Sequence, residues 1–144
     1  MKISKTPQPA SSAIIERDGR YLLVLRSNPP SADMYAFPGG RGEEGETPAE
    51  TALRELFEET GIRAEKPKLF ATYDLPGRED GPGSPSFRLS VFKVEADATA
   101  IAVASDDAAA VGWYTAEEIR TLPAPDSVRE CIRRLEAERT GQDA

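Results

Sequence analysis

The sequence contains no histidine and only one cysteine in 144 residues. Without histidine there can be no Ser-His-Asp or Cys-His nucleophile, no imidazole general base and no zinc site with imidazole ligands. Any catalysis must therefore use carboxylates, lysine, tyrosine or hydroxyl groups. The lone Cys131 cannot form an intramolecular disulfide or a thiolate zinc cluster, which favours a reducing, cytoplasmic location.

Long apolar runs and a positive charge balance are also missing. The longest apolar runs, 21–25 and 100–104, have five residues each, whereas a helix needs about 20 to span a bilayer. The N-terminal residues contain no apolar stretch of the kind found in signal peptides, so we expect no membrane partner. The formal net charge of −7 argues against binding of a nucleic acid polymer. It leaves phosphate chemistry open, because a metal ion can supply the positive charge.

The chain length fits one domain, and we expect a single α/β domain over residues 1–144 with ragged ends at 1–11 and 141–144. Asp18-Gly19 separates apolar segments at 13–15 and 21–25, which predicts a hairpin because both central turn residues need positive φ. Further strands are predicted at 69–75, 87–94, 100–103 and 111–114.

Two loops are predicted from their glycine and proline content. Pro38-Gly39-Gly40 predicts a stop after the apolar residues 35–37. Residues 76–85 are rich in glycine and proline and predict a polar, exposed connection between two strands. Loops of this kind often carry substrate specificity.

The clearest predicted element is a helix over residues 48–60. Thr47 and Glu50 form a capping-box pattern, Pro48 occupies the first helical position, and Gly61 stands where a left-handed C-terminal cap belongs. A second capping box predicts a short helix over 115–122. Asp126 is expected to cap a final helix to about residue 140, with Cys131 on its apolar, core-facing stripe.

Three glutamates crowd one face of the helix over 48–60. At 100° per residue, Glu55, Glu58 and Glu59 fall within an arc of about 100°. The opposite, apolar face is expected to carry Ala49, Leu53, Leu56, Phe57 and Thr60. Like charges at these spacings destabilise a helix, and the helix dipole disfavours them near its C-terminus. A hard divalent cation would offset the repulsion, although a solvated acidic helix face is the common alternative.

The run from Gly40 to Ile62 resembles the Nudix box, which is Gly, five residues, Glu, seven residues, then Arg-Glu-aliphatic-x-Glu-Glu-x-Gly-aliphatic. Nine fixed or class-restricted positions match over these 23 residues. The flanking runs Tyr35-Ala-Phe-Pro-Gly-Gly40 and Trp113-Tyr-Thr-Ala-Glu-Glu118 are also similar to the family. The resemblance implies the Nudix fold, which is a mixed β-sheet sandwiched between helices (α/β/α), and hydrolysis of a nucleoside diphosphate linked to another group.

The resemblance also implies roles for individual residues. Glu55, Glu58 and Glu59, with the Gly39 carbonyl, would hold Mg²⁺ or its substitute Mn²⁺. Arg54 and Glu46 would fix the rotamers of these ligands, as groups behind metal ligands do elsewhere. Asp106 or Asp107 lies where relatives supply one more acid, usually Glu, and a loop cap is the alternative. A metal-bound water would attack phosphorus in line, with Glu55 or another glutamate of the cluster as general base.

The substrate is less well marked than the chemistry. Pro76 lies 15 residues after Gly61, an offset similar to that of small ADP-ribose pyrophosphatases, so ADP-ribose or a related NDP-sugar is the first expectation. A housecleaning, MutT-like (d)NTP pyrophosphohydrolase is the second. The candidate substrate contacts are Arg26, Tyr35, Pro76, Arg78 and Arg88, whereas Phe37 is expected in the core.

Two other classes of protein remain open at this point. One is a catalytically silent Nudix-fold module that senses a ligand, although such relatives usually have a degenerate box. The other is an acidic structural protein, in which Glu58→Gln would be harmless and metal would not change the melting temperature. A homodimer that shares the substrate site is compatible with the family. Residues 40–62 hold seven acidic and two basic side chains, so most of the net charge lies in this one segment.

Overall fold

The computed structural model describes residues 7–27, 32–75, 86–106 and 108–141. Three candidate site residues, Pro76, Arg78 and Asp107, lie outside the described residues. The elements in chain order are β1 Gln8–Ile14, β2 Glu16–Arg17, β3 Arg20–Arg26, β4 Tyr35–Ala36, β5 Gly39–Arg41, α1 Pro48–Thr60, β6 Ala64–Leu75, β7 Phe87–Ala96, β8 Ala108–Thr115, α2 Ala116–Thr121 and α3 Asp126–Arg139.

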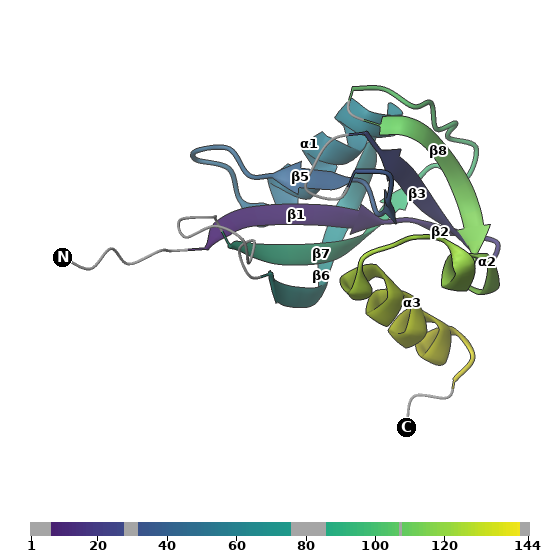
Figure 1. Cartoon of the computed structure of the whole chain (residues 1–144). Helices are drawn as coiled ribbons and strands as arrows, with labels where there is room; N and C mark the ends of the chain where they lie inside the picture. The colour runs from purple at the N-terminus through teal and green to yellow at the C-terminus, as the bar shows by residue number, and fades with distance from the viewer. Residues whose placement is uncertain (1–6, 28–31, 76–85, 107, 142–144) are drawn as a thin grey trace.

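The strands form two sheets (Figure 1). The first sheet has the order β5-β1-β7-β6, in which β1 and β7 are parallel and the other pairs are antiparallel. In the second sheet β3 pairs with β2 and β4, and it also pairs with β8 over most of its length. The mixed sheet predicted from the sequence is therefore confirmed.

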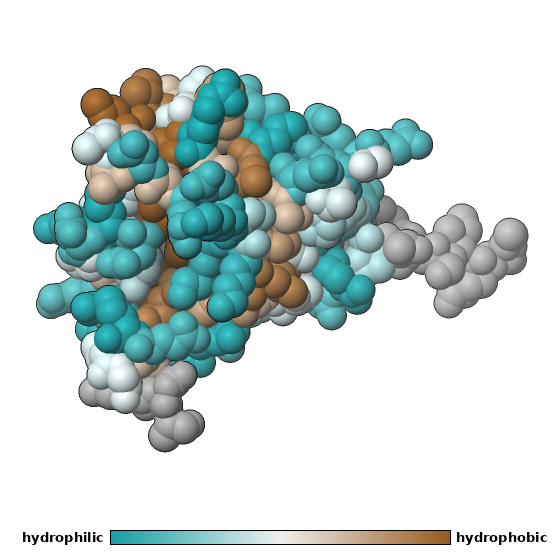
Figure 2. All heavy atoms as spheres, turned by 180° about the vertical axis from the view of Figure 1, so that it is seen from behind, coloured by the Kyte–Doolittle hydropathy of each residue, from teal (hydrophilic) through white to brown (hydrophobic). Residues whose placement is uncertain are grey.

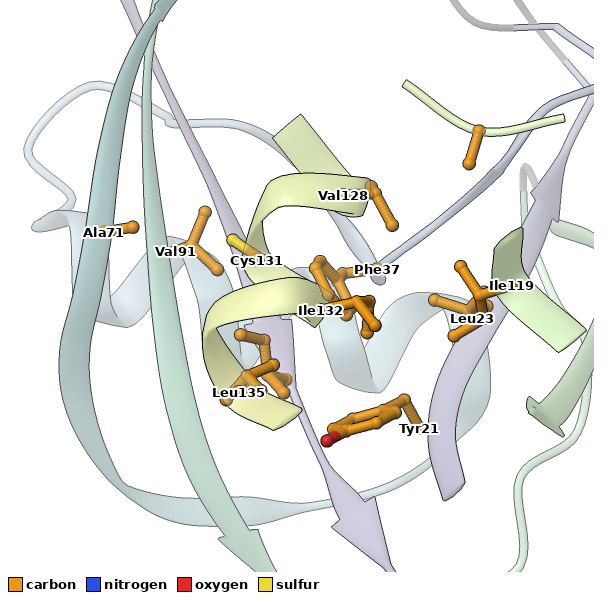
Figure 3. Packing of buried hydrophobic residues seen from close by; sticks show 12 residues of the cluster. Tyr21, Leu23, Phe37, Ala71, Val91, Ile119, Val128, Cys131, Ile132 and Leu135 are labelled. Carbon is orange, nitrogen blue, oxygen red and sulfur yellow. The ribbon is translucent and has the colours of Figure 1, made fainter. Parts of the chain in front are cut away.

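Helices α1 and α3 cover opposite faces of the first sheet, because neighbouring strand residues point to opposite sides. Ala13 and Phe92 belong to the buried cluster that includes Leu56 of α1. Ile14 and Val91 belong to the cluster that includes Ile132 of α3. Figure 3 shows this second cluster, with α3 lying against the strands and Phe37 and Cys131 inside it. The core positions predicted for Phe37 and Cys131 are confirmed.

The predicted hairpin is shorter than expected. Around Asp18-Gly19 the hairpin joins the two-residue strand β2 to the start of β3, in the register Glu16 with Tyr21. Most of the apolar segment 13–15 belongs to β1, which pairs with β5 and β7 in the other sheet. Strand β1 begins at Gln8, so residues 8–11 are part of the sheet rather than of a ragged end. Local turn chemistry identified the turn, but long-range pairing decided where each strand goes.

The strand predicted at 100–103 is wrong. This segment runs past the C-terminal end of α1, where Val103 N donates to Thr60 O (2.9 Å) and Ser105 N donates to Glu59 O (3.0 Å). Arg17 holds the preceding turn by donating to Ala100 O at 2.9 Å, with its guanidinium 4.3 Å from the centre of the Trp113 ring. The backbone groups of this apolar run are thus used by a helix end instead of a sheet.

Two details of the helices also differ from expectation. Phe57 is 40% exposed with the Arg63 guanidinium 4.2 Å from the centre of its ring, and Glu59 takes a buried place on α1. Asp126 is the first residue of α3, and Pro125 is the N-cap without a side-chain hydrogen bond. Asp126 still lies in the first turn, where the helix dipole favours negative charge.

The surface is mainly hydrophilic when seen from behind, with smaller groups of apolar side chains (Figure 2). Exposed large apolar residues in the described part of the chain include Leu69, Ile101 and Val103. Among the described residues, no helix is long and apolar enough to cross a membrane.

The C-terminal cap of α1 gives a first prediction. Gly61 has φ 77°, and a Cβ added there would meet nothing within 4 Å. Gly61→Ala should lower the free energy of unfolding by about 1 kcal/mol, because only the left-handed backbone opposes it. Gly61→Asn should cost less, since Asn tolerates this conformation. Urea unfolding followed by circular dichroism measures both, and an Asn variant less stable than the Ala variant would contradict the prediction.

Candidate active site

Two glycines bring strand β5 unusually close to its neighbours. A Cβ on Gly39 would lie 2.4 Å from Ser11 O and 2.7 Å from Ser12 Cβ. A Cβ on Gly40 would lie 2.5 Å from the Glu55 carboxyl group. The predicted stop is confirmed, since β4 ends at Ala36 and Pro38 lies in a bend, and Gly39 then begins β5 in the other sheet, where glycine permits this close approach. This approach places the β5 backbone directly against α1.

The buried Glu59 and the mostly buried Glu55 form a pair of carboxyl groups beside this backbone. Glu59 is 3% exposed and accepts a hydrogen bond from Gly39 N at 3.2 Å. The side chain of Glu55 is 14% exposed, and its carboxyl group is close enough to that of Glu59 for the charge of one to affect the pKa of the other. Burial raises the pKa of both carboxyls, and the neighbouring Glu55 charge raises that of Glu59 further. The fold therefore keeps two acidic groups side by side in a place where burial favours their neutral form.

Arg54 links the carboxylates around this pair. Its Nη1 donates to Glu55 Oε2 at 3.1 Å and to Glu58 Oε1 at 3.2 Å. Its Nε and Nη2 donate to the two carboxylate oxygens of Glu46 at 2.7 and 3.0 Å, and Nη2 also donates to Arg41 O at 2.9 Å. This planar, two-bond pairing with a carboxylate is the geometry for which a guanidinium is suited.

Glu46 is itself fixed from two other directions. Thr51 Oγ1 donates to Glu46 Oε1 at 2.7 Å, and the backbone N–H of Glu43 donates to the same oxygen at 2.9 Å. These bonds, with that of Arg54 as the largest cause, lower the pKa of Glu46 to about 2. Glu46 is therefore ionised at neutral pH and holds the guanidinium of Arg54 in a fixed orientation.

Glu58 lies apart from the buried pair. Its side chain is 41% exposed and bonds to Arg54. Across the described ranges, no three acidic side chains are gathered tightly enough to hold a metal ion. The structure thus brings together Glu55, Glu59 and the Gly39–Gly40 backbone, and it places Glu58 at their edge.

The residues present nevertheless fit a divalent cation. The donors are carboxylate and backbone oxygens, which Mg²⁺ and Mn²⁺ prefer, and the sequence offers no imidazole. Two carboxylates in contact repel when both are ionised, and a cation between them would remove that repulsion. Glu55, Glu59 and the Gly39 carbonyl would hold it, together with Glu58 after a side-chain movement.

The predicted substrate contacts are placed differently from one another. Arg26 ends β3, and its positive charge lowers the pKa of Glu59 against the larger effect of burial. Tyr35 packs on the core next to Tyr114, with their ring centroids 5.5 Å apart. Arg88 pairs with Asp74 at 3.0 Å on the strand surface.

Some contributing residues were missed by reasoning from the sequence. Thr51 is buried and holds Glu46, and its position five residues after Glu46 was the available signal. Ser11 and Ser12 are buried beside Gly39, and within the described structure their hydroxyl groups have no hydrogen-bond partner. Asp106 has φ 57° and follows Ser105, whose N–H bonds to Glu59 O. Its role as an additional acid stays a prediction.

Comparison with known proteins identifies the family to which this fold and site belong. The family model of the NUDIX domain matches residues 6–135. The chain therefore belongs to the NUDIX family, and the resemblance carried by residues 40–62 is confirmed.

Individual relatives agree with this assignment. An ADP-ribose pyrophosphatase from Methanocaldococcus jannaschii is 41% identical over 73 residues, 51% of this chain and 43% of that protein. An RNA pyrophosphohydrolase from Cereibacter sphaeroides is 44% identical over 69 residues, 44% of this chain and 42% of that protein. The matched region thus spans less than half of either curated relative. A MutT NUDIX hydrolase from Burkholderia pseudomallei has the same fold, with a TM-score of 0.79 at 24% identity over 90% of this chain and 98% of that chain.

The support that Thr51 gives to Glu46 can be tested. Thr51→Val keeps the shape of the side chain and removes the hydroxyl donor, so it should lower the free energy of unfolding by about 2 kcal/mol. Thr51→Ser keeps the hydroxyl and serves as the matched control. Urea unfolding at pH 7 compares them. A Thr51→Val variant as stable as the unaltered protein would show that the hydrogen bond to Glu46 contributes nothing.

Proposed function

We propose that this protein hydrolyses a pyrophosphate bond in a nucleoside diphosphate linked to another group, with Mg²⁺ as cofactor. The observation that carries the proposal is the buried contact of Glu55 and Glu59 beside the Gly39–Gly40 backbone. An acidic structural protein has no need to bury two carboxylates against each other. A site that binds a divalent cation uses such a pair, because the cation offsets the repulsion between the two carboxylates.

The side chains of the site have separate tasks in this proposal. When bound, the cation would neutralise the pyrophosphate and lower the pKa of a water molecule. Glu59 is fixed by Gly39 N–H, and Glu55 Oε2 is fixed by Arg54. Oε1 of Glu55 is the candidate proton acceptor for the attacking water, because Glu55 is less buried than Glu59. Arg26 supplies a positive charge that a phosphate group can contact.

ADP-ribose is the substrate we place first, with related NDP-sugars. The relative from Methanocaldococcus jannaschii is named an ADP-ribose pyrophosphatase, and so is one from Bacillus subtilis. The family also contains MutT proteins, so a housecleaning (d)NTP pyrophosphohydrolase is the second candidate. Exclusion of nucleic acid polymers stays a prediction, since another relative is named an RNA pyrophosphohydrolase. The homodimer and the cytoplasmic location stay predictions as well.

A product assay tests the proposal and separates the candidates. The protein is incubated with Mg²⁺ and, separately, with ADP-ribose, an NDP-sugar, each dNTP and 5′-triphosphorylated RNA, with EDTA as control. ADP-ribose should yield AMP and ribose 5-phosphate. Release of pyrophosphate from a dNTP would favour the second candidate. Tight binding of these compounds with no turnover would identify a silent ligand-sensing module and contradict the proposal.

Loss of one box carboxylate should stop the reaction. Glu59→Gln and Glu58→Gln should each lower kcat/KM by at least about a hundredfold, because a neutral amide cannot balance the charge of a divalent ion. Glu44→Gln removes one charge from the same acidic segment, at an exposed position outside the site, and should be active. Mg²⁺ should raise the Tm of the unaltered protein. Unchanged turnover in both site variants would exclude them as metal ligands.

The role of Arg26 is tested by a change in KM. Arg26→Met removes a cation that we place on a substrate phosphate, so KM should rise about tenfold, the value of one charge-assisted hydrogen bond. Arg88→Met is the matched comparison, because Arg88 is paired with Asp74 on the strand surface. Steady-state kinetics on the preferred substrate measures both. A larger rise in KM for the Arg88 variant would move the phosphate contact to that strand.

A further inference from the structure

We propose that Glu58 exchanges partners during cation binding. In the metal-free protein its carboxylate is held by Arg54, and it joins Glu55 and Glu59 only when a divalent cation binds. This inference rests on the proposed function. Arg54 then has two tasks. It pairs with Glu58 until a cation competes for that carboxylate, and it orients the neighbouring Glu55.

Arg54 is held in place by groups other than Glu58. Two bonds to Glu46 (2.7 and 3.0 Å) and one to Arg41 O (2.9 Å) hold its Nε and Nη2. Glu46 is held in turn by Thr51 Oγ1 at 2.7 Å. Only Nη1 is directed at the carboxylates of α1, so the guanidinium cannot follow Glu58 if that side chain moves.

Glu58, by contrast, is free to leave Arg54. It is one turn after Arg54 on the same helix, and the bond between Nη1 and Glu58 Oε1 is 3.2 Å. At 41% exposure, its carboxylate can be solvated while it moves. Ion pairs this exposed are weak, and exposed side chains change rotamer within nanoseconds.

The other two glutamates of the site cannot move in the same way. Glu59 is 3% exposed and tied to Gly39 N–H. Glu55 lies so close to Gly40 that a Cβ there would be 2.5 Å from its carboxyl group. The described residues therefore show two fixed acids and one movable acid, which accounts for the lack of a ready three-carboxylate group among them.

Titration calorimetry with Mn²⁺ and no substrate tests the exchange through a double-mutant cycle. The proteins are the unaltered chain, Arg54→Lys, Glu58→Gln and the double variant. Lysine keeps the charge, but one ammonium group cannot hold both oxygens of Glu46 and also reach Glu58. Arg54→Lys should tighten the Mn²⁺ Kd by about threefold more when Glu58 is present than in the Glu58→Gln background, as expected for release of one exposed ion pair.

The controls separate this inference from the proposed function. Arg63→Lys alters a guanidinium that lies over Phe57, just beyond the same helix end, and should leave the Kd unchanged. An Arg54→Lys effect that is equal in both backgrounds, or that weakens binding more when Glu58 is present, would overturn the exchange. Lack of Mn²⁺ binding by the unaltered chain would overturn the proposed function itself.

A second measurement needs no Arg54 variant and covers the case in which Arg54→Lys fails to fold. In protein labelled with ¹⁵N-arginine, Mg²⁺ should shift the Nη1 resonances of Arg54 more in the unaltered chain than in Glu58→Gln, because Nη1 donates to both Glu55 and Glu58 and only Glu58 leaves it. The Nε–H resonance, which reports the bond to Glu46, should be retained. Nη1 signals that do not change at saturating Mg²⁺ would overturn the exchange.

Discussion

The site depends on one constraint, which is the contact of the buried Glu59 carboxyl group with the backbone of Gly39. This contact needs a strand without side chains, because any Cβ on Gly39 would collide with Ser11 and Ser12 of β1. It also needs α1 to end at a fixed place, which Gly61 and the bond from Ser105 N to Glu59 O secure. Sheet, helix and the segment after β7 are thus positioned around a single carboxylate.

The charged groups around the Glu59 carboxylate form an inner acidic pair and an outer guanidinium with its partners. The inner layer is the Glu55 and Glu59 pair, which burial makes costly to ionise. The outer layer is Arg54, whose guanidinium is spread over several carboxylates, with Glu46 its fixed partner. One cation thus stabilises the cluster without neutralising it. The remaining negative charge would attract a divalent ion, which in turn could bind a pyrophosphate.

The sequence was most informative where structure is set by local contacts. Helix α1 begins and ends as predicted, because its capping box and its glycine cap involve residues within one turn of each end. The spacing of the motif residues over 23 positions identifies the family and the candidate glutamates Glu55, Glu58 and Glu59. Pairing partners were less accessible. The segment 13–15 was assigned to a hairpin with 21–25, yet β1 is placed by β7, about 80 residues further along the chain.

The sequence by itself determined the family and the crowding of Glu55, Glu58 and Glu59 on neighbouring positions of α1, because these depend on residue type and helical period. Only the tertiary structure decided that Glu59 is buried, that Glu58 is turned to Arg54, and that Gly39 and Gly40 belong to a strand of the first sheet. Helical spacing makes the three glutamates neighbours, but it does not tell which of them is buried and which is exposed. The exposure of each glutamate depends on which strand lies against it, and that is fixed by long-range packing.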